Sequence, residues 1–332
     1  MIGFLRAVFL LLCVAAILAG GAFFWVQGEF NKPGPLSADK NLVIPRGTGV
    51  EGIANLLHRE GVITNPAVFR IGVRLEDAQR GLRAGEFMFP AGASAHNVMS
   101  VLLNAQPVRR RITIPEGLTT QQVLEIVDIT DGLAGQTPGS LDEGILLPET
   151  YYFTFGDERE ALIQRMRSAS EAALAELWPD RVEGLPIRTP QEALILASIV
   201  EKETAVAQER QLVASVFINR LNRGMRLQSD PTVVYAVTGG SGPLGRSISK
   251  ADLGIDSPYN TYRNAGLPPG PIANPGRASI AAVLNPAESN YLYFVADGTG
   301  GHAFATNLSD HNRNVARWRR LRSLRSQQQD TN

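Results

Sequence analysis

The longest apolar stretch of the chain lies at its start. No charged residue occurs between Arg6 and Glu29, and most positions there are Leu, Val, Ala, Ile or Phe. About 20 consecutive apolar residues are enough to cross the hydrocarbon core of a bilayer. Residues 23–25 (Phe-Phe-Trp) stand near its end, and aromatic side chains favour the membrane–water interface. The pattern predicts a transmembrane helix over residues 1–28.

A cleaved signal peptide is the alternative for this segment, because small residues at 19–22 resemble a cleavage site. The uncleaved anchor is favoured because the apolar run continues beyond them. Arg6 precedes the span, so the N-terminus is expected in the cytoplasm and the rest of the chain on the periplasmic side of the inner membrane. Cys13, the single cysteine, lies within the span. The chain therefore has no internal disulfide and no thiolate metal cluster.

A short hydrophobic and polar pattern occurs three times after a linker at residues 29–40. Each copy has apolar or aromatic residues, then Pro-x-Gly, then apolar residues at i, i+3 and i+4, which predicts a strand, a tight turn and an amphipathic helix. The three copies begin at Pro45, Pro90 and Pro115. The candidate helix caps are Thr48, Ser94 and Thr119 or Thr120. The irregular period excludes a solenoid and favours a small α+β region over residues 41–135.

A different pattern marks one helix in the second half of the chain. It begins with a capping box between Thr189 and Glu192. Residues 193–200 are apolar apart from one serine, so this helix is expected to be buried. It ends in Glu201 and Glu203, and a carboxyl group in apolar surroundings has a raised pKa that suits a general acid. The alternative, a helix that surfaces and exposes ordinary charges, stays open at this point.

Conspicuous motifs follow one another from this helix to about residue 315. They are residues 197–204 (ASIVEKET), 213–221 (VASVFINRL), 225–232 (MRLQSDPT), 259–262 (YNTY), 266–270 (GLPPG), 291–295 (YLYFV) and 302–304 (HAF). Together they closely resemble the YceG-like family of endolytic murein transglycosylases. The first half is similar mainly in layout: a membrane span, a LysM-like region and a Pro-Glu-Thr-Tyr motif at residues 148–151.

The resemblance implies a lyase that cleaves the MurNAc–GlcNAc β-1,4 bond of nascent peptidoglycan strands. It would leave a 1,6-anhydro-MurNAc end and so terminate strand elongation. The catalytic glutamate of the family falls on Glu203, and Glu201 is the competitor. Glu203 is favoured because Thr204 follows it, similar to the Glu-Ser pair that ends the catalytic helix of lysozyme-like transglycosylases. Residues two apart on a helix point in different directions, so only one of the two can face a cleft.

Other side chains in these motifs suit sugar binding, because amide and hydroxyl groups pair with sugar hydroxyl and acetamido groups and aromatic rings stack on sugar faces. The expected substrate-binding residues are Asn219, Gln228, Asp230, Tyr259, Asn260 and Tyr262. Structural roles are the alternative for some of them: Asp230 as a helix cap before Pro231, and Asn260 as a turn residue.

The sequence as a whole predicts an α+β protein. Its parts are the transmembrane helix, a LysM-like α+β module, a mixed α/β catalytic domain over residues 136–325 with a buried catalytic helix, and a disordered tail over residues 326–332. Residues 291–296 and 302–306 read as a hairpin, and a basic helix capped by Ser309 follows. The LysM-like region either binds N-acetylglucosamine polymers or is a spacer without ligand.

The composition of the chain and the motifs absent from its sequence restrict the function further. Lys plus Arg and Asp plus Glu both number 32, which gives no reason to expect a nucleic acid partner. No metal or other cofactor is expected, because the four histidines form no His-Glu-x-x-His motif; a Gly-x-Ser-x-Gly nucleophile motif is also absent. The family resemblance implies glycan strands and penicillin-binding synthases as partners. A wall-binding scaffold without catalysis remains the alternative function.

Overall fold

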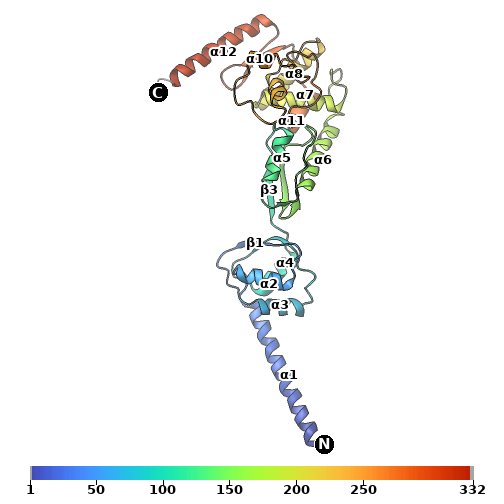
Figure 1. Cartoon of the computed structure of the whole chain (residues 1–332), viewed down its shortest axis with the longest axis vertical. Helices are drawn as coiled ribbons and strands as arrows, with labels where there is room; N and C mark the ends of the chain where they lie inside the picture. The colour runs from blue at the N-terminus through green and yellow to red at the C-terminus, as the bar shows by residue number, and fades with distance from the viewer. Residues whose placement is uncertain (1, 330–332) are drawn as a thin grey trace. The chain divides into compact units, whose positions relative to one another are not determined.

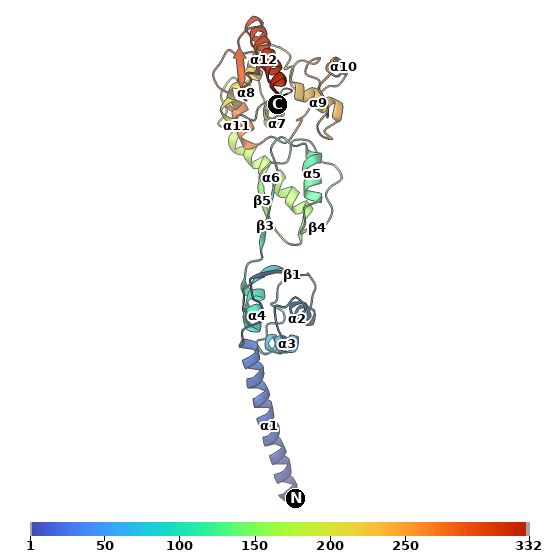
Figure 2. The same ribbon diagram turned by 90° about the vertical axis from the view of Figure 1, so that its left-hand side faces the viewer.

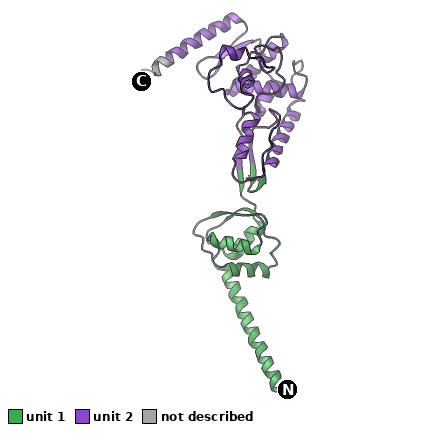
Figure 3. Cartoon of the chain, in the orientation of Figure 1, with its two compact units in different colours: residues 1–110, 152–157 green, residues 111–151, 158–332 purple. Residues whose placement is uncertain are grey.

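The chain forms two compact units, which Figure 3 distinguishes by colour. The computed structural model describes residues 2–329, and side chains over residues 3–324. Unit 1 comprises Met1–Arg110 with Tyr152–Asp157, and unit 2 comprises Arg111–Tyr151 with Glu158–Asn332. Helices and short strands occur in both, which confirms a mixed α and β architecture.

Unit 1 begins with the long apolar helix α1 (Ile2–Asn31), which is long and apolar enough to cross a membrane. Its last turns behave differently from the rest, because Val26 and Phe30 are buried. They pack against α3 (Pro66–Leu75) and α4 (Ala95–Asn104). A Cβ atom on Gly72 of α3 would overlap the Phe30 ring, so glycine permits this close packing. The end of α1 is therefore part of the hydrophobic core of unit 1 (Figure 1).

All three predicted strand–turn–helix repeats are present. They are β1 (Lys40–Ile44) with α2 (Val50–Arg59), β2 (Gly85–Phe89) with α4, and β3 (Arg109–Thr113) with α5 (Thr120–Asp128). The glycine of each Pro-x-Gly turn, Gly47, Gly92 or Gly117, has a positive φ of 67–78°. Ser94 and Thr119 cap their helices as expected, whereas α2 is preceded by Gly49 and has no side-chain cap from Thr48. β1 and β2 pair antiparallel, with Leu42 opposite Phe87.

The remaining strands and helices complete the fold. The strands are β4 (Leu133–Ala134), β5 (Thr150–Thr154), β6 (Asp157–Glu158), β7 (Tyr293–Ala296) and β8 (His302–Ala305). The helices are α6 (Arg159–Leu177), α7 (Pro190–Glu203), a 3₁₀ turn (Ala207–Glu209), α8 (Arg210–Asn222), α9 (Asp230–Thr238), α10 (Lys250–Leu253), α11 (Arg277–Leu284) and α12 (Leu308–Gln329). Within residues 2–329 every sheet is two-stranded: β1–β2, β3–β5, β4–β6 and β7–β8. The predicted hairpin is thus β7–β8.

Helix α7 runs through the core of unit 2. Residues 193–200 are all buried, and α8, α9 and α11 pack around them (Figure 2). The capping box of Thr189 and Glu192 is present as predicted. The one polar residue of the stretch, Ser198, donates to the Ile195 carbonyl at 2.7 Å and accepts from the Ile272 amide at 3.0 Å. A fully satisfied hydroxyl explains why the buried helix tolerates this serine.

The boundary between the units differs from the predicted one at residue 135, since residues 111–135 belong to unit 2. Asn274, which is fully buried, holds them there. Its Nδ2 donates to the Leu118 carbonyl at 3.1 Å, and its Oδ1 accepts from the Leu146 amide at 2.9 Å. At the other end of the unit, α12 continues to Gln329, through much of the predicted tail; residues 330–332 lie outside the described residues.

Replacing Asn274 should destabilise unit 2. Asn274→Ala leaves the buried Leu146 amide without its acceptor, whereas the Leu118 carbonyl keeps the hydrogen bond at 2.8 Å from the backbone amide of residue 274. The free energy of unfolding should therefore fall by about 1–3 kcal/mol. Urea unfolding followed by circular dichroism measures the change. Asn312→Ala, at an exposed position of α12, is the matched control and should change stability by less than about 0.5 kcal/mol. Equal losses in the two variants would contradict this role of Asn274.

Candidate active site

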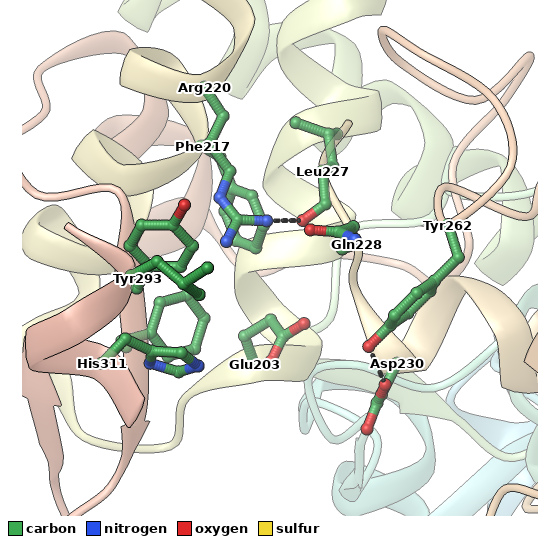
Figure 4. A pocket seen from close by; sticks show the side chains of 11 residues that line it. Glu203, Phe217, Arg220, Leu227, Gln228, Asp230, Tyr262, Tyr293 and His311 are labelled. Carbon is green, nitrogen blue, oxygen red and sulfur yellow. Dashed lines mark hydrogen bonds between the residues drawn. The ribbon is translucent and has the colours of Figure 1, made fainter. Parts of the chain in front are cut away.

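A pocket of about 370 Å³ lies at the C-terminal end of α7 (Figure 4). Its walls come from α7, α8, the loop before α9, the start of α9, the loop after α10, β7 and α12. The lining residues are Glu203, Phe217, Arg220, Leu227, Gln228, Asp230, Tyr262, Tyr293, Phe294, Leu308 and His311. The pocket therefore collects residues from five of the sequence motifs and from the last helix.

Glu203 is the last residue of α7 and faces this pocket, with the rest of its surroundings filled by protein. The Ser229 hydroxyl donates to its Oε1 at 2.6 Å. Burial raises the pKa of Glu203 to about 7; the Ser229 hydrogen bond opposes this rise, Asp230 adds to it and Arg220 opposes it. Near neutral pH the group exists in both protonation states, as a group that must donate and then accept a proton requires.

Glu201 points elsewhere. Its Oε2 accepts from the Gly276 amide at 3.0 Å and from the Ser279 hydroxyl at 2.7 Å. Gly276 is the N-cap of α11, so the Glu201 carboxylate satisfies a free amide at the positive end of a helix dipole. Between the two glutamates, Lys202 donates to the Gly117 carbonyl at 3.0 Å. At the end of α7, Glu201 is thus hydrogen-bonded to the start of α11, and Glu203 faces the pocket.

Arg220 holds in place the loop that carries Ser229, the hydrogen-bond donor to Glu203. Its Nη1 donates to the Leu227 carbonyl at 2.6 Å and its Nε to the Leu292 carbonyl at 2.7 Å. The next residue of the loop, Gln228, has φ of +51°, a left-handed conformation that is costly for a residue other than glycine. The guanidinium group therefore fixes the backbone from which Ser229 reaches Glu203.

Two further groups of side chains form the opposite walls. On one side the Tyr262 hydroxyl donates to Asp230 Oδ1 at 2.6 Å, and burial followed by this contact raises the pKa of Tyr262. On the other side His311 stacks on Tyr293, with ring centroids 5.1 Å apart. Burial and the nearby Arg220 lower the pKa of His311, so the ring is neutral near pH 7. Its buried Nδ1 has no hydrogen-bond partner within the described part of the chain.

Three of the six expected substrate-binding residues line the pocket with Glu203: Gln228, Asp230 and Tyr262. Asp230 is the first residue of α9 rather than its cap, which is Ser229. The structure therefore brings the MRLQSDPT and YNTY motifs to the same hollow as the end of α7.

Asn219, Tyr259 and Asn260 do not line the pocket, and the structure gives each of them other partners. The Asn219 amide donates to the carbonyls of Ser289 and Tyr291 at 2.9 and 3.0 Å. Asn260 is fully buried, and its amide donates to the carbonyls of Leu253 and Ile255, as its alternative turn role requires. The Tyr259 ring packs against Tyr235 at 4.8 Å.

Sequence reasoning missed four pocket residues or their neighbours: Ser229, Arg220, Tyr293 and His311. A signal existed for Arg220, since it is a charged residue in a helix that is otherwise buried over residues 213–218. Ser229 and Tyr293 lay inside quoted motifs without an assigned role. No local pattern points to His311, because α12 is strongly polar and the pairing of His311 with Tyr293 depends on tertiary packing.

Known proteins provide a separate comparison. The chain matches the YceG-like family over residues 42–317. A protein of Streptococcus pneumoniae strain R6 named endolytic murein transglycosylase is 32% identical over 353 residues, covering 91% of this chain and 63% of that protein. This chain therefore spans less than two thirds of the length of that relative. A Bacillus subtilis strain 168 protein of the same name is 32% identical over 337 residues, covering 90% of each chain.

A solved structure gives a similar result. The crystal structure of a YceG-like protein from Listeria monocytogenes is 30% identical and has a TM-score of 0.51, covering 83% of this chain and 99% of that one. The sequence comparisons and the structural comparison point to the same family as the sequence motifs. Because the family match covers most of its length, this chain belongs to the YceG-like family.

Proposed function

We propose that this chain is an endolytic peptidoglycan lytic transglycosylase in which Glu203 is the single acid/base. It cleaves the MurNAc–GlcNAc β-1,4 bond of nascent glycan strands and leaves a 1,6-anhydro-MurNAc end, which terminates strand elongation. The observation that carries the proposal is a carboxyl group with a pKa of about 7 at the wall of a pocket built from the family motifs. The names of the similar proteins agree with it.

In the first step, protonated Glu203 donates its proton to the glycosidic oxygen, and the bond from that oxygen to C1 of MurNAc breaks. The 2-acetamido group of the substrate stabilises the cationic C1. A pKa of about 7 keeps a large share of Glu203 protonated at neutral pH, and a carboxyl group with an ordinary pKa of 4.5 would rarely carry a proton there.

In the second step, the Glu203 carboxylate takes the proton of the C6 hydroxyl of the same MurNAc, and O6 bonds to C1. Glu203 then carries a proton again and the cycle closes without water. Glycosidases usually use two carboxyl groups. Asp230 is the other carboxyl group of the pocket, but its Oδ1 already accepts from Tyr262. One carboxyl group is sufficient because the same group acts as acid and then as base.

Sugar binding is proposed for Gln228, Asp230 and Tyr262, whose polar groups line the pocket beside Glu203. The stacked rings of Tyr293 and His311 offer an aromatic surface on the opposite wall. The contacts of Asn219, Tyr259 and Asn260 favour support of the pocket walls for these three residues. Arg220 acts as a positioning residue through the loop that holds Ser229.

The remaining parts of the proposal concern location and partners. The apolar helix α1 anchors the chain in the inner membrane, with its N-terminus in the cytoplasm and the rest in the periplasm. Glycan binding by a LysM-like module is proposed for unit 1, and its strand–helix elements support this proposal. Penicillin-binding synthases are proposed as partners, because a strand-terminating enzyme must act on strands that are still being polymerised.

Glu203→Gln should abolish strand cleavage. The amide cannot donate a proton as an acid, so the rate of anhydro-end formation should fall by a factor of about 10² to 10⁴. Purified uncrosslinked glycan strands are incubated with the full-length protein in detergent, and the products are separated by chromatography and identified by mass. An unchanged secondary-structure spectrum shows that the variant is folded.

Glu201→Gln is the matched control. Its amide oxygen can still accept from Gly276 and Ser279, so cleavage should stay within a factor of a few of the wild type. Cleavage by Glu203→Gln with none by Glu201→Gln would overturn the assignment of the catalytic residue. If the wild type itself does not cleave but binds strands, the scaffold function replaces the enzyme.

The pH dependence of strand cleavage should change when the residues that set the pKa of Glu203 are replaced. Only the protonated acid starts the reaction, so kcat/KM should fall as pH rises above about 7. Ser229→Ala removes a hydrogen bond that stabilises the carboxylate, raises the pKa and should move this limb to higher pH. Asp230→Asn removes a negative charge, lowers the pKa and should move the limb to lower pH. Shifts in the same direction would contradict the proposed cause.

A further inference from the structure

One face of α3 in unit 1 is exposed although it carries large apolar side chains. Ile71 and Leu75 are 44% and 49% exposed, whereas Val68, Phe69, Gly72 and Val73 are buried. Arg70 and Arg74 alternate with the exposed apolar pair. An apolar and cationic stripe on a helix is typical of a surface that lies in a membrane interface.

The depth of α3 relative to the proposed membrane span follows from α1. Its exposed apolar residues continue to Trp25, and Phe30 is the residue that packs on Gly72 of α3. At 1.5 Å per residue, Phe30 lies about 7 Å beyond Trp25 along the helix. The headgroup layer on each side of a bilayer is about 5–8 Å thick. If the hydrocarbon ends near Trp25, α3 lies in the headgroup layer.

The direction of the exposed face follows from helix geometry. Leu75 is three residues after Gly72, and Ile71 is four before Leu75, so these side chains form a stripe directly beside the contact with α1. Arg70 lies on the side of α2, where it pairs with Glu51 at 3.1 Å. Figures 1 and 2 both place α3 beside the end of α1, and β1 on the opposite side of unit 1.

The chemistry of the face also suits phospholipid. A hollow of about 420 Å³ lies between α2 and α3. It is lined by Val50, Glu51, Ala67, Arg70, Ile71, Arg74, Leu75 and Gln79. Arg74 has no acidic partner among residues 2–329, and a guanidinium group binds a phosphate through paired hydrogen bonds. The two apolar side chains can reach the acyl carbonyl level while the arginine stays with the phosphates.

We propose that the exposed face of α3, residues 67, 70, 71, 74 and 75, is a phospholipid-contacting surface that seats unit 1 on the membrane. The inference rests on the proposed membrane anchor and is independent of the catalytic proposal. Its consequence is mechanical: α1 and the rest of unit 1 move as one body at the bilayer surface, because Phe30 joins them and α3 prevents the unit from tilting away.

Site-specific fluorescence can test this, since Cys13 is the single cysteine. In a Cys13→Ala background, Ile71→Cys or Leu75→Cys is labelled with an environment-sensitive dye, and the full chain is placed in phosphatidylcholine–phosphatidylglycerol vesicles. Met88→Cys is the matched control, because Met88 is as exposed as Leu75 but lies on β2, which pairs with β1. Lipids with nitroxide groups on the headgroup or the upper acyl chain quench dyes at those depths.

At positions 71 and 75, quenching by these lipids should be at least twofold stronger than at position 88. The protein labelled at its own Cys13 tests the anchor, and lipids with nitroxide deep in the acyl chain should quench it. Quenching at Cys13 with equal, weak quenching at 75 and 88 overturns the α3 proposal and leaves the anchor intact. No quenching at Cys13 overturns the anchor and this proposal with it.

Other occupants of the face give different results. If the dye at position 75 is shielded only when glycan fragments are added, the face binds wall polymer and the proposal fails. Shielding only at high protein density in the vesicles assigns the face to a second copy of the chain, which also overturns it. Cleavage activity enters none of these readouts, so the catalytic proposal stands or falls separately.

Discussion

The placement of one carboxyl group at the end of a buried apolar helix is the constraint on which the structure of unit 2 depends. Helix α7 is buried along residues 193–200, and its last turn, at the boundary of the core, carries Glu201, Lys202 and Glu203. Glu201 accepts hydrogen bonds from an amide and a hydroxyl at the start of α11. Glu203 receives one hydroxyl, from Ser229, and its burial favours the neutral form.

The surrounding elements hold that balance in place. Arg220 tethers the loop of residues 226–229, and its charge also lowers the pKa of Glu203 as the smallest of the contributions that act on it. Asp230 works in the opposite direction, and Tyr262 holds it by a hydrogen bond. A pKa near 7 is thus the result of burial, modified by the opposing effects of Ser229, Asp230 and Arg220. The strained φ of Gln228 is tolerated because the hydrogen bonds of its neighbours fix the loop.

In unit 1, apolar contacts hold the elements in place. Phe30 enters the core beside Gly72, so the apolar helix and the first unit share one hydrophobic cluster. A flexible connection after α1 would have left the rest of unit 1 free to rotate about it. The shared core instead fixes α3 against α1, with Gly72 at the contact and the exposed Ile71 and Leu75 beside it.

The sequence by itself determined the local features. Hydrophobic periodicity, Pro-x-Gly turns and capping boxes predicted the apolar first helix, the three strand–turn–helix repeats and the buried helix, because each depends on contacts within a few residues. The tertiary structure alone decided the rest. Residues 111–135 joined unit 2 through Asn274, 128 to 156 positions distant from its hydrogen-bond partners. Asn219, Tyr259 and Asn260 took positions outside the pocket, and Arg220, Tyr293 and His311 entered it, because pocket membership is set by packing between distant segments, which no local pattern encodes.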